Sequence, residues 1–244
     1  MTIKTTQTSP QVYARITGAL YLAVIALGIF AEAFTTGKLV VPGDAAATAH
    51  NILNSPGLWK LGVGADLLVV IFAIPQLWLE YFLLKPVNKQ LAQISVLFNL
   101  VSLAVESISK LFLLLVMPIL GDVDYLKSFN SDQIHVLANL ALRSHDLAFN
   151  IALIFFGFTC LLNGYLIFRS GYFPKFVGAL MQLAGLSYLI ACFAQLFTPA
   201  FGNMITPGIL MPALIGETSF CLWLLVKGVN MVKWNEKVSL EQQV

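Results

Sequence analysis

The chain has few charged residues, few cysteines and few histidines. Only 11% of its 244 residues are Asp, Glu, Lys or Arg, against about 25% in an ordinary soluble domain. This scarcity excludes a soluble globular protein, because 58% of the residues are hydrophobic and a water-facing domain of this length cannot bury them all. It also excludes intrinsic disorder, which requires low hydrophobicity and high charge. The net charge of +2 is too small for a nucleic-acid-binding surface.

The sequence also lacks the short motifs of common enzyme families. It contains no HExxH or CxxC motif, no phosphate-binding loop, no GxSxG motif and no dinucleotide fingerprint. Its cysteines, Cys160, Cys192 and Cys221, all lie inside apolar runs, where a thiol usually acts as a small hydrophobic group. These absences predict no cofactor and no metal centre, and they leave open whether the protein is an enzyme.

Long hydrophobic runs are abundant. A helix needs about 20 mostly apolar residues to cross the hydrocarbon core of a bilayer. Six segments meet this requirement: Arg15–Phe34, Leu61–Leu84, Leu91–Ile119, Leu147–Phe168, Phe176–Phe197 and Pro207–Val232. The sequence therefore predicts an all-α, polytopic membrane protein, a bundle of six transmembrane helices whose partner is the lipid bilayer. One alternative for the first run is a cleaved signal peptide, because Ala31-Glu32-Ala33 resembles a cleavage site.

The basic residues between the spans predict the orientation of the bundle. One side carries Lys4, Arg15, Lys85, Lys89, Arg169, Lys175, Lys227, Lys233 and Lys237. The other side carries only Lys38, Lys60, Lys127 and Arg143. By the positive-inside rule the richer side is cytoplasmic, which places both termini in the cytoplasm. We therefore expect a cytoplasmic tail at residues 1–12, one membrane domain at residues 13–234 and a second cytoplasmic tail at residues 235–244.

Two longer connections on the outer side contain signals for helix starts. Asp44 is expected to cap a short helix over Ala45–Leu53. Asn130 together with Gln133 resembles a capping box, and a helical pattern runs from there into the fourth span. We therefore expect short amphipathic outer helices, the second of them continuous or nearly continuous with the fourth membrane helix.

Ionisable side chains inside the spans are costly in lipid and are therefore candidates for function. A helical rise of about 1.5 Å per residue, counted from the cytoplasmic end of each span, predicts one outer layer for most of them. For Glu217, counted from Lys233, the predicted height is about 24 Å. Glu80 alone is expected near the cytoplasmic side. The candidate ligand-binding residues are Glu32, Asp66, Glu106, Lys110, Arg143, His145, Asp146, Asn150 and Glu217.

Polar residues also repeat at helical spacing along two of the spans. The stripe on the third span comprises Ser95, Asn99, Ser102, Glu106 and Ser109 or Lys110, and the stripe on the fourth comprises Asn139, Arg143, Asp146 and Asn150. Such stripes face the bundle interior or a wet cavity, because lipid cannot satisfy their hydrogen bonds. We therefore expect the acids of the outer layer to face one common interior space.

Three interpretations of this layer are open. In the first, the acids form an outward-facing pocket that binds a small solute or cation. In the second, they and His145 hold a divalent metal that activates water in an intramembrane hydrolase. In the third, Glu106–Lys110 and Arg143–Asp146 neutralise one another, and the protein is structural or binds a partner protein. The first is our leading hypothesis. A transporter should in addition show a second, cytoplasmic vestibule or discontinuous helices, and a scaffold should have its acids paired off and its pocket closed.

Several strings along the chain resemble one family of membrane proteins. They include Arg15-Ile16-Thr17-Gly18, Val41-Pro42-Gly43-Asp44-Ala45-Ala46, Leu84-Lys85-Pro86-Val87-Asn88 and Arg169-Ser170-Gly171-Tyr172-Phe173-Pro174. Their order and spacing, from about Tyr13 to Gly228, resemble domain-of-unknown-function family 4386, uncharacterised bacterial multi-pass membrane proteins. The resemblance implies a protein of the bacterial inner membrane. It implies no activity and no catalytic residues, so the three interpretations stand.

Overall fold

The computed structural model describes residues 9–121 and 123–241, and all regular structure in these residues is helical. The elements are α1 (Pro10–Ile29), η1 (Phe30–Thr36), α2 (Gly37–Leu39), α3 (Ala45–Asn54), α4 (Pro56–Leu84), α5 (Lys89–Leu120), η2 (Asp124–Leu126), α6 (Ser131–Ser170), α7 (Lys175–Phe197), α8 (Pro199–Ile209), α9 (Met211–Val226) and α10 (Met231–Glu241). Among them are six segments long and apolar enough to cross a membrane. The prediction of an all-α protein with six membrane spans is therefore confirmed.

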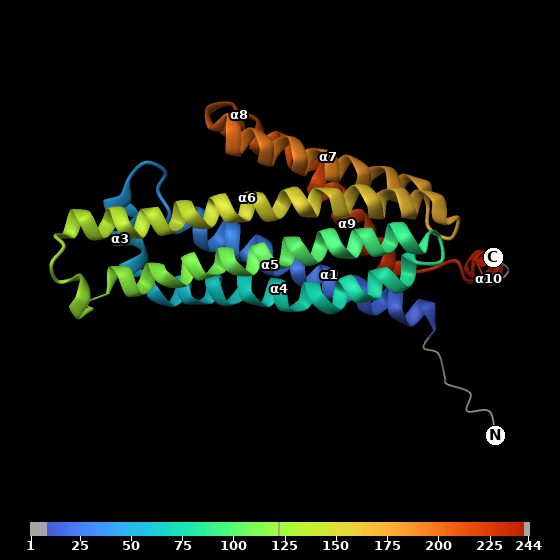
Figure 1. Ribbon diagram of the computed structural model, residues 1–244. Coiled ribbons are helices and arrows are strands. Elements are labelled where there is room, and N and C mark those ends of the chain that lie inside the picture. Colours follow the sequence, from blue (N-terminus) through green and yellow to red (C-terminus); the bar gives the residue numbers. More distant parts are fainter. Residues whose placement is uncertain (1–8, 122, 242–244) are drawn as a thin grey trace, which may run out of the picture.

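The contacts between the six spans close a ring. Figure 1 shows the elongated bundle from the side. Following the chain, α1 packs against α4, α4 against α5, α5 against α6, α6 against α7, and α7 against α9. Helix α9 packs back against α1 and closes the ring. The start of α1 and helix α10 lie at the same end of the bundle (Figure 1), as an even number of spans requires. We name this end the inner end, and the opposite end the outer end.

Two of the predicted helix starts are present. The Asp44 carboxylate accepts the N–H of Ala47 at 2.8 Å and caps α3. Asn130 and Gln133 each accept the other's backbone N–H at 3.0 Å, which is the predicted capping box. From this cap α6 runs for 40 residues without interruption, so the outer helix and the fourth span are one helix.

Close packing of α6 against α7 depends on glycines at their interface. A Cβ atom on Gly164 would lie 2.7 Å from the backbone nitrogen of Gln182, and one on Gly185 would lie 2.6 Å from the carbonyl oxygen of Gly157. Small residues let two helix backbones approach closely, and in lipid the resulting dispersion contacts hold the helices together.

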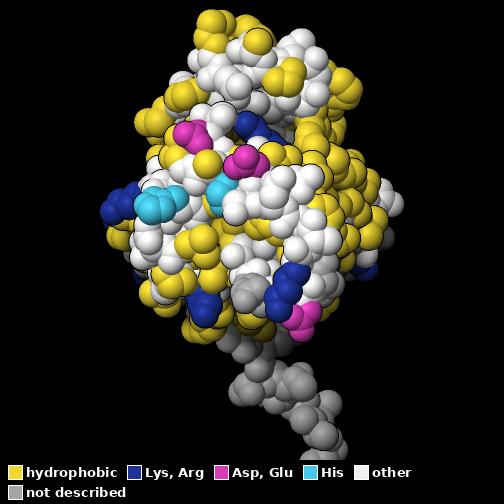
Figure 2. Space-filling model, turned by 90° about the vertical axis from the view of Figure 1, so that its left-hand side faces the viewer, with side chains coloured by type: hydrophobic (Ala, Val, Ile, Leu, Met, Phe, Trp, Pro, Cys, Tyr) yellow, Lys and Arg dark blue, Asp and Glu magenta, His cyan; other side chains and the backbone are white. Residues whose placement is uncertain are grey.

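The outer end of the bundle extends beyond α7. Helices α6 and α7 form a hairpin joined by residues 171–174, so the end of α6 and the start of α7 lie at the same level. With 40 residues against 23, α6 projects about 25 Å further than α7. This projecting part packs with α3 and the outer ends of α4 and α5 around a separate core that includes Ile52, Trp59 and Val116. We call this region the outer lobe. Figure 2 looks onto it and shows basic, acidic and histidine side chains among apolar ones.

The sixth span differs from the prediction of one helix over Pro207–Val232. It consists of α8 and α9, which meet at Leu210, and it ends at Val226. Pro207 and Pro212 flank the joint, and a proline interrupts a helix because it has no N–H to donate. Past Val226 the chain turns at Gly228, whose φ of +67° favours glycine, before α10 begins.

Candidate functional site

A cavity of about 400 Å³ lies inside the ring of spans. Every span contributes to its wall, which is mostly apolar. The polar side chains that line it are Tyr21, Glu32, Gln76, Asn99, Ser102, Glu106, Tyr188 and Glu217. The predicted polar stripe of the third span therefore does face an interior space, through Asn99, Ser102 and Glu106.

Glu217 on α9 is the most enclosed acid of the cavity. Its side chain is buried between two tyrosines of other helices. The Tyr21 hydroxyl donates to Oε2 at 3.0 Å, and the Tyr188 hydroxyl donates to Oε1. Within the described part of the chain no basic side chain forms an ion pair with Glu217. The carboxyl group is thus held in one orientation by two neutral donors, with no cation beside it.

The height of Glu217 differs from the sequence prediction. Its span ends at Val226 and not near Lys233, so Glu217 lies only about 14 Å from the inner end of α9. Its partner Tyr21 lies eleven residues before Glu32 along the first span, which corresponds to about 16 Å. Glu217 therefore belongs to a deeper level than Glu32. The single outer layer of acids is wrong for this residue.

Glu80 forms a second buried acidic group, next to the inner part of the cavity. The Gln76 amide donates to its Oε1 at 2.9 Å, and the Asn163 amide donates to its Oε2 at 3.0 Å. Asn163 in turn accepts the Ser95 hydroxyl at 2.6 Å. Gln76 also lines the cavity, is only 8% exposed, and its Oε1 finds no hydrogen-bond partner among the described residues. The sequence analysis placed Glu80 at a different level from the other acids, and it did not identify Gln76 as a residue of the cavity.

Lys110 ties two of the candidate acids together. Its ammonium lies 3.2 Å from Asp66 Oδ1 and 3.7 Å from Glu106 Oε1, and the side chain is 1% exposed. The same ammonium lies 4.6 Å from the ring centre of Phe149, a cation–π contact. Asp66 and Glu106 therefore share one positive charge. This triad of Asp66, Glu106 and Lys110 joins α4 to α5 at the base of the outer lobe, and Phe149 adds a contact from α6.

Glu32 lies on the wall of the cavity at the outer end of the first span. It belongs to η1, a seven-residue π-helical segment that continues α1. Such wider turns are frequent at functional sites, because they reposition a side chain that a regular helix would aim elsewhere. The Glu32 carboxylate is exposed and lies close enough to Asp66, Lys110 and Asp146 to interact with their charges.

The remaining candidates, all on α6, do not line the cavity. Arg143 and Asp146 are exposed, and no ion pair joins them in the described residues. The Asn150 amide donates to the carbonyl of Asp146 at 2.8 Å. His145 is buried and bonds through Nδ1 to the Ser109 carbonyl at 3.1 Å, so this nitrogen carries the proton. The fourth-span stripe is therefore a helix surface, on which Arg143 and Asp146 are close enough for their charges to interact without forming an ion pair.

No metal ligand set is present in residues 9–121 and 123–241. Nowhere there do three His, Cys, Asp or Glu side chains come together closely enough to hold a metal ion. His50 bonds to Asn54 on α3, far along the chain from His145. The described residues therefore provide no set of metal ligands for the hydrolase interpretation.

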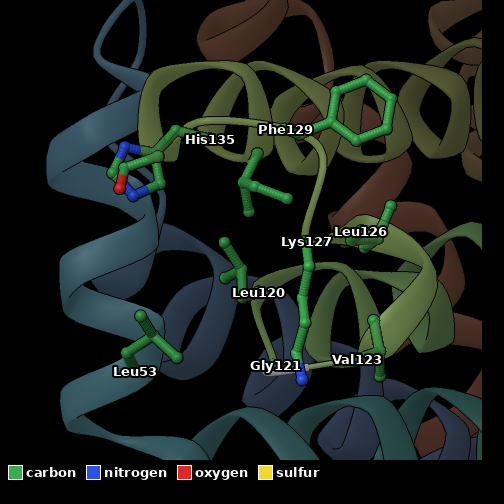
Figure 3. A pocket seen from close by; sticks show the side chains of 10 residues that line it. Leu53, Leu120, Gly121, Val123, Leu126, Lys127, Phe129 and His135 are labelled. Atoms are coloured by element: carbon green, nitrogen blue, oxygen red, sulfur yellow. The ribbon is translucent and has the colours of Figure 1, made fainter.

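A second pocket, of about 320 Å³, lies in the outer lobe (Figure 3). Leu53 of α3 and His135 of α6 lie on one side of it, and the Lys127 side chain runs toward Gly121. The Lys127 ammonium is already paired with Asp124 at 2.6 Å, and that pair is exposed to solvent. This pocket has no convergent buried charges, so the cavity inside the ring is the better candidate site.

The family model described as Domain of unknown function (DUF4386) matches residues 16–228. The chain belongs to this family. A protein of Archaeoglobus fulgidus, described as an uncharacterized protein, is 28% identical over 161 residues, which is 66% of this chain and 80% of that protein. No solved structure matches the chain. The resemblance seen in the sequence strings is confirmed, and neither description names a ligand.

Proposed function

We propose that this multi-pass membrane protein binds a small, largely apolar organic cation, of the type of a protonated amine, in the cavity inside the ring. One observation carries the proposal. Three carboxylates, of Glu32, Glu106 and Glu217, line the cavity, whereas no Lys or Arg among the described residues does. Lys110 offsets one charge of the Asp66–Glu106 pair, so the surroundings of the cavity have a negative balance.

The bilayer makes this imbalance significant. An ionised carboxylate away from water is strongly disfavoured unless a cation or several donors accompany it. Glu217 has only two tyrosine hydroxyls. A bound ammonium group next to Glu217 would supply the missing positive charge, and an uncharged or anionic ligand would not.

The remaining wall of the cavity suits the rest of such a ligand. The free Oε1 of Gln76 can accept an N–H, which a protonated amine has and a quaternary ammonium lacks. Phe149, Phe156 and Tyr188 provide aromatic surface for an apolar group and for cation–π contact. The volume of about 400 Å³ is in the range of sites for small molecules, about 300–1,000 Å³.

We propose translocation of the same cation as a second candidate function. The break between α8 and α9 at Leu210 supports this candidate, because a discontinuous helix is one of the two features expected of a transporter. We also propose that the inner end faces the cytoplasm of a bacterial inner membrane. Arg169 and Lys175 flank the inner ends of α6 and α7 there, in agreement with the positive-inside rule.

The test of binding uses three probes of nearly equal size: phenethylamine, phenethyl alcohol and phenylpropionate. The purified full chain in phosphatidylcholine nanodiscs is heated with each probe, and the unfolding temperature is recorded. We expect the amine alone to raise this temperature, in proportion to the logarithm of its concentration once the site is saturated. Equal stabilisation by the amine and the alcohol would refute a site that selects cations.

Two variants of the same charge change locate the site. Glu217→Gln removes a charge inside the cavity, and Glu236→Gln removes one on the exposed surface of α10. We expect Glu217→Gln to abolish the shift caused by phenethylamine while the protein without probe stays folded. Glu236→Gln should respond like the parent. A parental response of Glu217→Gln would place any amine binding elsewhere.

A further inference from the structure

Helices α1 and α9 are in close contact in their inner halves. A Cβ atom on Gly18 would lie 2.8 Å from the Leu225 side chain and 2.9 Å from its backbone nitrogen. The Cys221 thiol donates to the Gly18 carbonyl at 3.4 Å. About one turn further out, Tyr21 and Glu217 form the next contact between the two helices.

Further out, the two helices separate. A Cβ atom on Gly28 would have no neighbouring atom within 4 Å, unlike one on Gly18. Ile29 of α1 and Leu214 of α9 both line the cavity, and yet the two residues are 45% and 44% exposed. A residue that lines a cavity and is also exposed lies at its opening. We call this gap, bounded by Gly28, Ile29, Leu210 and Leu214, the lateral opening.

The joint between α8 and α9 accounts for this separation. Helix α8 lies against α7, where a Cβ atom on Gly202 would come within 2.8 Å of the Gln195 backbone. The Gln195 amide also donates to the Thr206 hydroxyl at 2.9 Å. The last span therefore bends at Leu210 toward α7, and the outer half of α1 is left without a neighbour on that side.

The lateral opening lies at the depth of the lipid hydrocarbon. Gly28 is about 20 Å from Arg15 along the first helix, and Leu214 is about 18 Å from Val226 along α9. Both heights fall inside a hydrocarbon core of about 30 Å. The opening therefore faces acyl chains, and its margins are apolar except for Glu32 just beyond Ile29.

We infer that the ligand is a single-chain amphiphilic amine that enters from the lipid through the lateral opening. This inference rests on the proposed binding of a cation in the cavity. The ammonium group lies near Glu217 and the free Oε1 of Gln76, and the hydrocarbon chain leaves between Ile29 and Leu214. A phospholipid fits less well, because its phosphate would meet the carboxylates of Glu32 and Glu217.

A photoreactive probe tests this arrangement directly. The purified full chain in phosphatidylcholine nanodiscs is irradiated with dodecylamine that carries a diazirine in its chain, and labelled residues are identified by mass spectrometry. The control probe has the same chain with an alcohol head group. We expect the amine to label residues 25–29 and 210–214 about tenfold more than the alcohol does. The alcohol cannot form the charge-assisted hydrogen bond of the ammonium group, and loss of one such bond weakens binding by about this factor. Excess phenethylamine should suppress this labelling.

Two glycine variants test the opening itself. Gly28 and Gly64 both have open space around them, but only Gly28 lines the cavity. Gly28→Trp should strongly reduce labelling by the amine, and Gly64→Trp should leave it at the parental level. An equal reduction in both variants would overturn the lateral opening, as would labelling spread evenly over the lipid-facing helices.

The outcomes separate the two proposals. If phenethylamine stabilises the parent protein but the amine probe labels residues 25–29 and 210–214 no more than the alcohol does, the cavity binds cations and the lateral opening is wrong. If phenethylamine neither stabilises the protein nor competes with the probe, the proposed cation site is wrong, and the inference that rests on it falls as well.

Discussion

Replacing Lys110 with methionine should destabilise the folded protein by about 3–5 kcal/mol, the cost of leaving buried charges without their partner. The ammonium of Lys110 lies between the carboxylates of Asp66 and Glu106, which are only 7% and 14% exposed. Methionine has nearly the same length and keeps the contact with apolar neighbours, so the change removes charge and little volume. What remains is two largely buried acids without the base that paired with them.

The magnitude follows from the distances. At an effective dielectric constant of about 20, charges separated by 3.2 Å attract with roughly 5 kcal/mol, and those separated by 3.7 Å attract with slightly less. Part of this attraction offsets the desolvation of the three groups and the repulsion between the two acids. Removal of the base alone keeps these costs and loses the attraction, which is why the expected effect is large.

An exposed ion pair in the same chain provides the control. Lys127 lies 2.6 Å from Asp124, closer than Lys110 to either of its acids, but the two side chains are 61% and 95% exposed. Water screens this pair, so Lys127→Met should cost less than about 1 kcal/mol. The free energy of unfolding is measured in mixed micelles by titration with sodium dodecyl sulfate, followed by circular dichroism.

A double-mutant cycle isolates the interaction of Lys110 with Asp66. If the buried charges are coupled, Asp66→Asn combined with Lys110→Met should be less destabilised than the sum of the two single variants, by about 1–3 kcal/mol. The reasoning is refuted if Lys110→Met costs no more than Lys127→Met, or if the two changes at Lys110 and Asp66 are additive. Either result would mean that the burial of the triad has no energetic consequence.

Three further predictions concern packing, backbone and topology. Gly164→Ala should lower the free energy of unfolding by about 1–3 kcal/mol through overpacking against α7, whereas Gly208→Ala, in open space, should not lower it. Gly171→Ala should lower the free energy of unfolding by about 1–2 kcal/mol in the same titration. The cause is the φ of +77° alone, because a Cβ atom on Gly171 would meet no other atom within 4 Å. A cysteine at Asp124 should be labelled from outside intact cells, and a reporter fused after Val244 should be active in the cytoplasm; labelling only after permeabilisation would contradict this orientation.

The elements of this fold that depend on local sequence were predictable. Hydrophobic length indicates a span, and a side chain next to a helix start indicates a cap, so the six spans and the caps at Asp44 and Asn130 needed no knowledge of packing. The pairing of Glu106 with Lys110 was predictable for the same reason, since residues four apart share one helix face. The additional ion pair of Lys110 with Asp66 comes from another helix and could not be read from spacing.

The depth of Glu217 could not be predicted, because the estimate assumed a helix without interruption. Pro207 and Pro212 are evident in the sequence. Whether such prolines kink a helix or divide it depends on the tertiary contacts available to the segment that precedes them. Here Gly202 and Thr206 give α8 a second surface on α7. Partners from distant helices, such as Tyr188 for Glu217, likewise depend on the ring arrangement and have no signal in the sequence.

Removing the charge of Lys110 and removing that of Glu217 should therefore have different effects on the stability of the fold. At Lys110 the charge holds helices together, and its loss lowers stability. At Glu217 the carboxylate accepts one hydrogen bond on each oxygen from a neutral donor, and no base depends on it. Glutamine keeps one accepting oxygen and relieves the desolvation of an ion, so Glu217→Gln should unfold at no lower detergent fraction than the parent. Its loss of amine binding would then reflect the missing charge in the cavity and not a damaged fold. A Glu217→Gln variant as unstable as Lys110→Met would instead show that Glu217 serves the structure.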